Sequence, residues 1–238
     1  MIRLFIGNKN YSSWSLRAWL TLSRCPVSFE EVLIPLDQAD TSARIRVHSP
    51  SGRVPALDLN GLQVWDSLAI GETLAEHFPA ALLWPAAPAS KAHARAITAE
   101  MHAGFAALRR ELPMNMRARR RVEASAQALS DIARVHFLLA DCRTRYHQGG
   151  PWLFGAWSIA DAFYAPVVSR FLTYGVAGVE TAVAGDQGRS AAELERQDKI
   201  VAAYIETVRT DAAFDAWSDA ARHELEVVEA DEAGSELH

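Results

Sequence analysis

The chain has 238 residues, of which 50% are hydrophobic and 22% are charged, the composition of an ordinary globular protein rather than a disordered or fibrous one. Its formal net charge of −5 argues against nucleic-acid binding by the protein as a whole. No apolar run is long enough to span a bilayer, and the length allows one large domain or two modest ones.

Cysteine and histidine usage gives no sign of a metal site. Cys25 and Cys142 are far apart, and the eight histidines include no His-x-x-x-His spacing. The first residues lack the basic segment, apolar core and cleavage site of a signal peptide. The sequence therefore predicts a reduced, cytoplasmic protein that binds neither a metal, nor nucleic acid, nor a membrane.

Strand and helix patterns alternate at the start of the chain. Ile2–Ile6 has the continuous apolar character of a buried central strand. The polar residues 11–15 lead into an apolar helical pattern that ends at Cys25-Pro26, and residues 29–34 alternate as a second strand. Residues 37–47 are polar, with a weak helical period.

A hairpin and a helix are predicted next. Asn60-Gly61 between two apolar runs is a strong signal for a tight turn, so Ala56–Leu59 and Leu62–Trp65 should be antiparallel strands. Asp66 and Ser67 then precede a helical pattern, and both residue types are good N-caps.

This stretch also has two features of a site for a small peptide. If the bond between Val54 and Pro55 is cis, the backbone N–H and C=O of Val54 can face outward and pair with a ligand. A helix that starts at Asp66-Ser67 offers free N–H groups and a positive dipole end, which suit a carboxylate. The alternatives are a trans bond, which most X-Pro bonds adopt, and a pair that only caps the helix.

The remainder of the chain reads as helical. Three prolines in residues 79–88 indicate a linker. Helices are predicted over 91–112, over 122–146, after the capping-box residues Ser158 and Asp161, and over 191–207. Residues 176–188 have no clear period and are expected to form a loop or flap, and the acidic tail 224–238 is expected to be disordered.

The order of these elements is that of a thioredoxin-like fold. Arg53-Val54-Pro55-Ala56-Leu57, followed by Trp65-Asp66-Ser67, resembles the glutathione-binding signature of the glutathione transferase superfamily. The resemblance implies an α/β thioredoxin-like N-terminal domain in residues 1–79, a linker in 80–88 and an all-α helical domain in 89–223. It also implies a homodimer, for which Met101 and Phe105 offer apolar residues on the fourth helix.

The segment from Tyr11 to Arg17 resembles the serine-type transferases, and the zeta class in particular, where a serine pair precedes an arginine at the same offset. The resemblance implies that Ser12 activates the glutathione thiol and that Ser13 is its neighbour. Trp14 departs from the zeta motif, which has cysteine there. Tyr11 is a competing hydroxyl donor, and the serines could also do no more than cap the helix.

The resemblance further implies that glutathione is the co-substrate. Arg53 would contact its glycine carboxylate, Val54 at the Pro55 bond its cysteinyl backbone, and Asp66 with Ser67 its γ-glutamyl end. An electrophile would bind beside five residues: Tyr11, Trp14, Met114, Asn115 and Arg117. The expected activity is transfer of the glutathione thiolate to a small electrophile; the alternatives are a zeta-like isomerase of the maleylacetoacetate type and a non-catalytic binding module.

Overall fold

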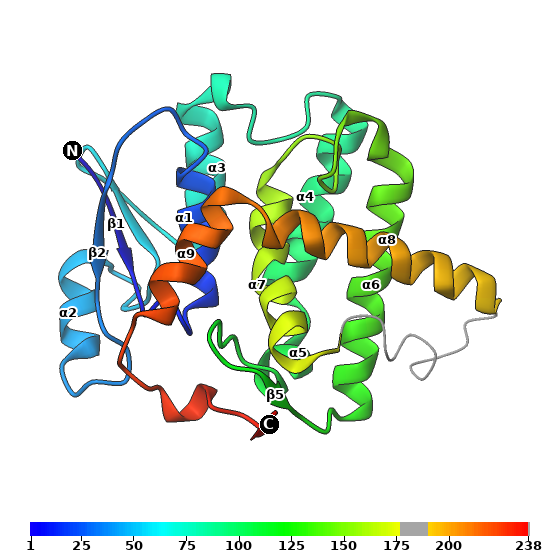
Figure 1. Cartoon of the computed structure of the whole chain (residues 1–238). Coiled ribbons are helices and arrows are strands. Elements are labelled where there is room, and N and C mark those ends of the chain that lie inside the picture. Colours follow the sequence, from blue (N-terminus) through cyan, green and yellow to red (C-terminus); the bar gives the residue numbers. More distant parts are fainter. Residues whose placement is uncertain (177–189, 238) are drawn as a thin grey trace.

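The structure is a computed structural model that describes residues 1–176 and 190–237. An α/β unit at the N-terminus lies beside a larger group of helices (Figure 1). This arrangement confirms the expected thioredoxin-like domain followed by a helical domain. The predicted loop at 176–188 lies, apart from Val176, outside the described residues.

The four-stranded sheet has the order β2-β1-β3-β4. Its strands are β1 (Ile2–Ile6), β2 (Glu30–Leu33), β3 (Ala56–Leu59) and β4 (Leu62–Trp65). Strand β1 is parallel to β2 and antiparallel to β3, and β3 is antiparallel to β4. The predicted hairpin is confirmed: Asn60 and Gly61 both have positive φ, which a tight turn between twisted strands requires.

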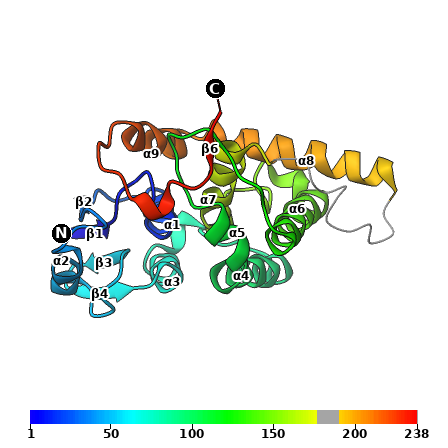
Figure 2. The same ribbon diagram turned by 90° about the horizontal axis from the view of Figure 1, so that it is seen from below.

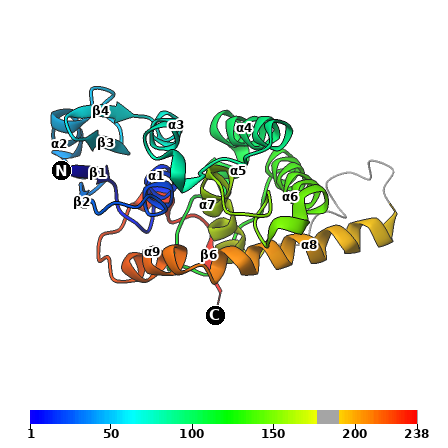
Figure 3. The same ribbon diagram turned by 90° about the horizontal axis from the view of Figure 1, so that it is seen from above.

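Helices cover both faces of the sheet. Successive side chains of β1 point to opposite faces and therefore pack into two different cores. Leu4 and Ile6 pack into the large core with α1 (Ser13–Leu22) and α3 (Ser67–His77), whereas Phe5 packs with Ile45 of α2 (Thr41–His48). Figures 2 and 3 show the sheet between α2 on one side and α1 with α3 on the other.

The helical part is organised around α7 (Ile159–Tyr174), which is buried along almost its whole length and packs against α1, α4 and α8. The predicted capping box at its start is confirmed, because the Asp161 carboxylate accepts the backbone N–H of Ser158 at 2.8 Å and that of Leu153 at 3.0 Å. The other helices are η1 (Pro79–Ala81), α4 (Pro88–Ala103), α5 (Ala106–Glu111), α6 (Ala126–Tyr146), η2 (His147–Gly149), α8 (Ala191–Arg209), α9 (Ala212–Arg222) and η3 (Glu229–Asp231). Within the described ranges, no helix has the length and apolar character needed to cross a membrane.

The helix predicted over 91–112 is two helices, with the break at Gly104 and Phe105. Gly104 is extended and Phe105 has a φ of 57°, and a Cβ at position 104 would lie 2.7 Å from the Glu100 carbonyl oxygen. Met101 and Phe105 are 0% and 7% exposed, so they belong to the core and offer no surface to a second subunit. The homodimer itself stays a prediction, which light scattering at micromolar concentration would test.

The acidic tail also differs from the expected disorder. After α9 it crosses back towards α1 and ends beside β5 (Arg120–Arg121), with which β6 (Ser235–Glu236) pairs (Figure 1). Its acidic side chains are engaged: Glu224 accepts the N–H groups of Lys9 and Asn10, and Glu232 pairs with Arg120. These contacts neutralise and order a segment whose composition alone favours disorder.

Candidate functional site

Ser12 is the N-cap of α1, and its hydroxyl is part of a short chain of hydrogen bonds. The Gly7 N–H donates to Ser15 Oγ at 3.1 Å, and Ser15 Oγ lies 2.7 Å from Ser12 Oγ. The Ser15 N–H also donates to Ser12 Oγ, at 3.4 Å. When Ser15 is the donor in the hydroxyl pair, both lone pairs of Ser12 are used and its hydrogen is free to donate to a ligand. A hydroxyl of this kind at a helix N-terminus favours a thiolate.

A cavity of about 610 Å³ opens beside Ser12. The predicted residues Tyr11, Ser12, Ser13, Trp14 and Met114 line it, together with Arg53 and Val54 from the loop before β3. The structure therefore brings together the predicted thiol-activating hydroxyls and three of the five residues expected to contact an electrophile. We call the cavity beside Ser12 the second cavity, and the adjoining cavity at the start of α3 the first cavity.

The first cavity, of about 450 Å³, lies between the loop before β3 and the start of α3. It contains every residue that the sequence assigned to glutathione, and it shares three lining residues with the second cavity, so the two adjoin. The shared residues are Trp14, Arg53 and Val54; Ser51, Pro55, Trp65, Asp66 and Ser67 complete the first cavity.

The backbone of Val54 is available in the first cavity. The bond between Val54 and Pro55 is cis, as the sequence analysis predicted. Neither the N–H nor the C=O of Val54 is hydrogen-bonded to a residue in the ranges 1–176 and 190–237. A half-buried peptide group of this kind can pair with the backbone of a ligand.

Asp66 and Ser67 have different roles at the start of α3. Asp66 caps the helix, with Oδ1 accepting the Leu68 N–H at 2.7 Å, and its backbone has a φ of 76°, which is uncommon for a residue with a side chain. Its other oxygen lies 3.4 Å from Nε2 of His102 in α4. Ser67 is 1% exposed, and its Oγ lacks a partner among the described residues. Because a buried hydroxyl without a partner is costly, Ser67 indicates a polar ligand.

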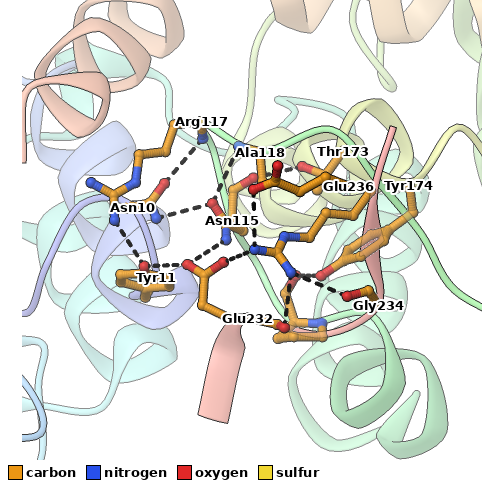
Figure 4. Close-up of polar contacts among 12 residues, drawn as sticks. Asn10, Tyr11, Asn115, Arg117, Ala118, Thr173, Tyr174, Glu232, Gly234 and Glu236 are labelled. Atoms are coloured by element: carbon orange, nitrogen blue, oxygen red, sulfur yellow. Dashed lines mark hydrogen bonds and ion pairs between the residues drawn. The ribbon is translucent and has the colours of Figure 1, made fainter. Parts of the chain in front are cut away.

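Asn115 and Arg117 do not line either cavity. Asn115 is fully buried and bonds to Asn10 and Glu232, and Arg117 donates to the Tyr11 hydroxyl (Figure 4). Arg117 also donates to the backbone oxygens of Glu224 and Glu226 in the tail. The structure thus places both in a network that joins α1 to the tail, away from the predicted electrophile site.

Two buried arginines near the cavities had no role in the sequence analysis. The Arg17 side chain lies between Trp14 and Phe163, 4.2 and 4.9 Å from their ring centroids, and burial lowers its pKa to about 9. Arg170 of α7 donates to Ser13 Oγ at 3.5 Å and lines the second cavity. The signal for Arg170 in the sequence was a charged residue near the end of the largely apolar helix 159–174.

Residues 11–77, which contain both serines and the first cavity, match a protein-family model described as the glutathione S-transferase N-terminal domain. This segment of the chain therefore belongs to that domain family. A probable maleylacetoacetate isomerase from Caenorhabditis elegans is 32% identical to this chain over 93 residues, which are 39% of this chain and 42% of that protein. The alignment therefore spans about two fifths of the curated relative.

Solved structures share the fold over nearly the whole chain. A glutathione transferase homolog from Burkholderia, crystallised with bound glutathione, is 23% identical and has a TM-score of 0.60, covering 93% of this chain and 97% of that chain. Glutathione transferase Omega 2S from Trametes versicolor is 22% identical, with a TM-score of 0.63 and coverage of 94% and 97%. At these identities the likeness concerns the fold alone.

Proposed function

We propose that this protein is a glutathione transferase, which adds the thiolate of glutathione to a small electrophile. The observation that carries the proposal is the pair of adjoining cavities. One presents the backbone of Val54 and the hydroxyl of Ser67, both without a partner among the residues that the structure describes, and the other presents the Ser12 hydroxyl. A peptide thiol bound in the first cavity would direct its sulfur towards the second.

The first cavity can hold each part of glutathione. The Asp66 carboxylate would take the γ-glutamyl ammonium, and Ser67 with the first N–H groups of α3 would take its carboxylate. The cysteinyl backbone would pair with Val54, and Arg53 would contact the glycine carboxylate. Two of these groups, the Val54 backbone and the Ser67 hydroxyl, have no hydrogen-bond partner among the described residues.

Ser12 would stabilise the thiolate without forming a covalent bond. A free thiol has a pKa near ~8.5, and each unit by which the site lowers that pKa is worth about 1.4 kcal/mol. The Ser12 hydrogen bond and the positive end of α1 both act in this direction. The protein's contribution is then thiolate stabilisation and positioning of the two substrates.

Isomerisation is the second candidate, because the curated relative is named a probable maleylacetoacetate isomerase. In that reaction the thiolate adds to a cis double bond, rotation follows, and the thiolate is expelled, so glutathione is not consumed. Trp14, which stands where the zeta motif has cysteine, distinguishes this chain from that class.

Two measurements test the proposal. Calorimetry with glutathione should show binding that the Asp66→Asn and Ser67→Ala variants weaken. An assay with glutathione and one electrophile each for conjugation, isomerisation and peroxide reduction then identifies the reaction. Absence of glutathione binding to the wild-type protein would overturn the proposed function.

A further inference from the structure

The second cavity is strongly basic. Four arginines line it, whereas Asp231 is its only acidic residue in the part of the chain that the structure describes. The arginines come from the loop before β3, from α5 and from α7: Arg53, Arg109, Arg110 and Arg170. Charge is therefore the property by which this cavity can best distinguish one electrophile from another.

Arg170 is the buried member of this group. It is 4% exposed and donates to the carbonyl oxygens of Leu112 and Pro166 at 2.8 and 2.9 Å. Among the residues in 1–176 and 190–237, no carboxylate lies within 4.0 Å of its guanidinium. Burial lowers the pKa of Arg170 to about 10, so the group is a cation at neutral pH. A buried cation without a contacting carboxylate favours an anion in the adjoining cavity.

The negative charge of Asp231 opposes this preference for an anion. The position of Asp231 depends on the hydrogen-bond network shown in Figure 4. It is carried by η3 of the tail, next to Glu232, whose carboxylate accepts hydrogen bonds from Tyr11 at 2.5 Å and from Asn115 at 2.9 Å. These bonds hold the tail against the cavity. The charged groups that act on Asp231 are Arg170, Glu232 and Asp37.

We propose that Asp231 is a specificity-determining residue that sets the charge preference of the second cavity by offsetting Arg170. The proposal rests on the function proposed above, because it takes the cavity as the electrophile site. The arginines attract electrophiles that carry a carboxylate, and the negative charge of Asp231 weakens the binding of these electrophiles. The affinity for neutral electrophiles of the same shape does not depend on Asp231.

A matched pair of probes isolates this effect. 4-Chloro-3,5-dinitrobenzoate and its methyl ester differ in charge, and a thiolate displaces chloride from either as the new carbon–sulfur bond forms. Calorimetry without glutathione measures their direct binding to the wild-type protein and to Asp231→Asn. Asp231→Asn should bind the acid about tenfold more tightly, the scale of one unit charge at this range, and the ester equally well.

Two further variants control for tail packing. Glu229→Gln removes an acidic residue of the same tail that lines a different cavity, and it should change neither affinity. Asp231→Glu should restore the wild-type ratio of affinities. Equal acid-to-ester ratios in the wild type and Asp231→Asn, or no binding of the acid by either, would overturn the role of Asp231. Because these measurements need no turnover, a missing glutathione-dependent reaction would count against the proposed function and not against Asp231.

Discussion

Tyr11 donates its hydroxyl hydrogen to Glu232, 221 positions later in the chain, at 2.5 Å. The same hydroxyl accepts a hydrogen bond from Arg117 at 2.9 Å. Burial, together with the hydrogen bond to Glu232, raises the pKa of Tyr11. Its hydroxyl is thus committed to the tail, whereas the Ser12 hydroxyl has a hydrogen free for a ligand when Ser15 is the donor in the hydroxyl pair. This difference favours Ser12 over Tyr11 as the group that stabilises the thiolate.

Ser12→Ala should lower the conjugation rate by roughly 10- to 1000-fold, the scale for loss of one stabilising donor. Glutathione affinity should change little, because the binding groups lie in the first cavity. Steady-state kinetics and calorimetry on the same preparation separate the two effects. Tyr11→Phe is the control. If Ser12→Ala is fully active and Tyr11→Phe is inactive, Tyr11 is the group that stabilises the thiolate.

Ser67→Ala should weaken glutathione binding and leave the melting temperature nearly unchanged. Its hydroxyl has no partner among the described residues, so its loss breaks no bond within the protein. Calorimetry beside a thermal melt checks both statements. A marked fall in melting temperature with unaltered affinity would make Ser67 a purely structural residue.

Asp66→Asn tests the other half of the γ-glutamyl site. Asn caps a helix about as well as Asp, so stability should hold. The charge-assisted bond to the ligand ammonium is worth roughly 1.5–3 kcal/mol, so the dissociation constant should rise about tenfold or more. Unchanged affinity in a calorimetric titration would leave Asp66 as a helix cap.

His136 should make the protein less stable as the pH falls. Its side chain is fully buried, neither ring nitrogen is hydrogen-bonded within the described residues, and burial lowers its pKa to about 4. Between pH 6.5 and 4 the unfolded chain binds a proton that the folded protein does not. The free energy of unfolding should therefore fall with decreasing pH, by up to about 1.4 kcal/mol per pH unit from this group.

Urea denaturation at several pH values in that range measures how steeply the free energy of unfolding changes with pH. His136→Gln removes the titrating group and should flatten the slope, whatever it does to stability at neutral pH. An identical slope in the variant would show that His136 does not take part.

Asp161→Ala should lower the free energy of unfolding by about 3 kcal/mol or more. The carboxylate is 1% exposed and accepts four hydrogen bonds, from two backbone N–H groups and from the hydroxyls of Ser158 and Tyr204. Chemical denaturation measures the loss. Asp219→Ala, at an exposed ion pair, is the matched control and should change stability by less than about 1 kcal/mol.

Local signals made part of this structure predictable. The turn at Asn60-Gly61 has a backbone requirement that few sequences meet, and the capping box of Ser158 and Asp161 satisfies its own helix end, so both hold in the structure. Most residues that line the first cavity lie close together in sequence, between Ser51 and Ser67, whereas Trp14 comes from α1.

Features that depend on distant contacts could not be predicted. Asn115 and Arg117 follow Pro113 at the end of a helix, but hydrogen bonds to Asn10 and to the tail draw them away from the cavity. The tail is ordered for the same reason, since its carboxylates pair with groups over 100 positions away. The composition of such a segment contains no information about its partners elsewhere in the chain. Composition alone therefore favours disorder.

Residues far along the chain help to hold the loop before Ser12. Glu224 accepts the N–H groups of Lys9 and Asn10 at 2.7 and 3.0 Å, and the Trp217 indole donates to the Lys9 carbonyl oxygen at 2.9 Å. During synthesis, the N-terminal segment thus leaves the ribosome more than 200 residues before the groups that shape it. A nascent chain would contain Ser12 from the outset, yet it would gain a working thiol site only after Glu224 and Glu232 had emerged and docked.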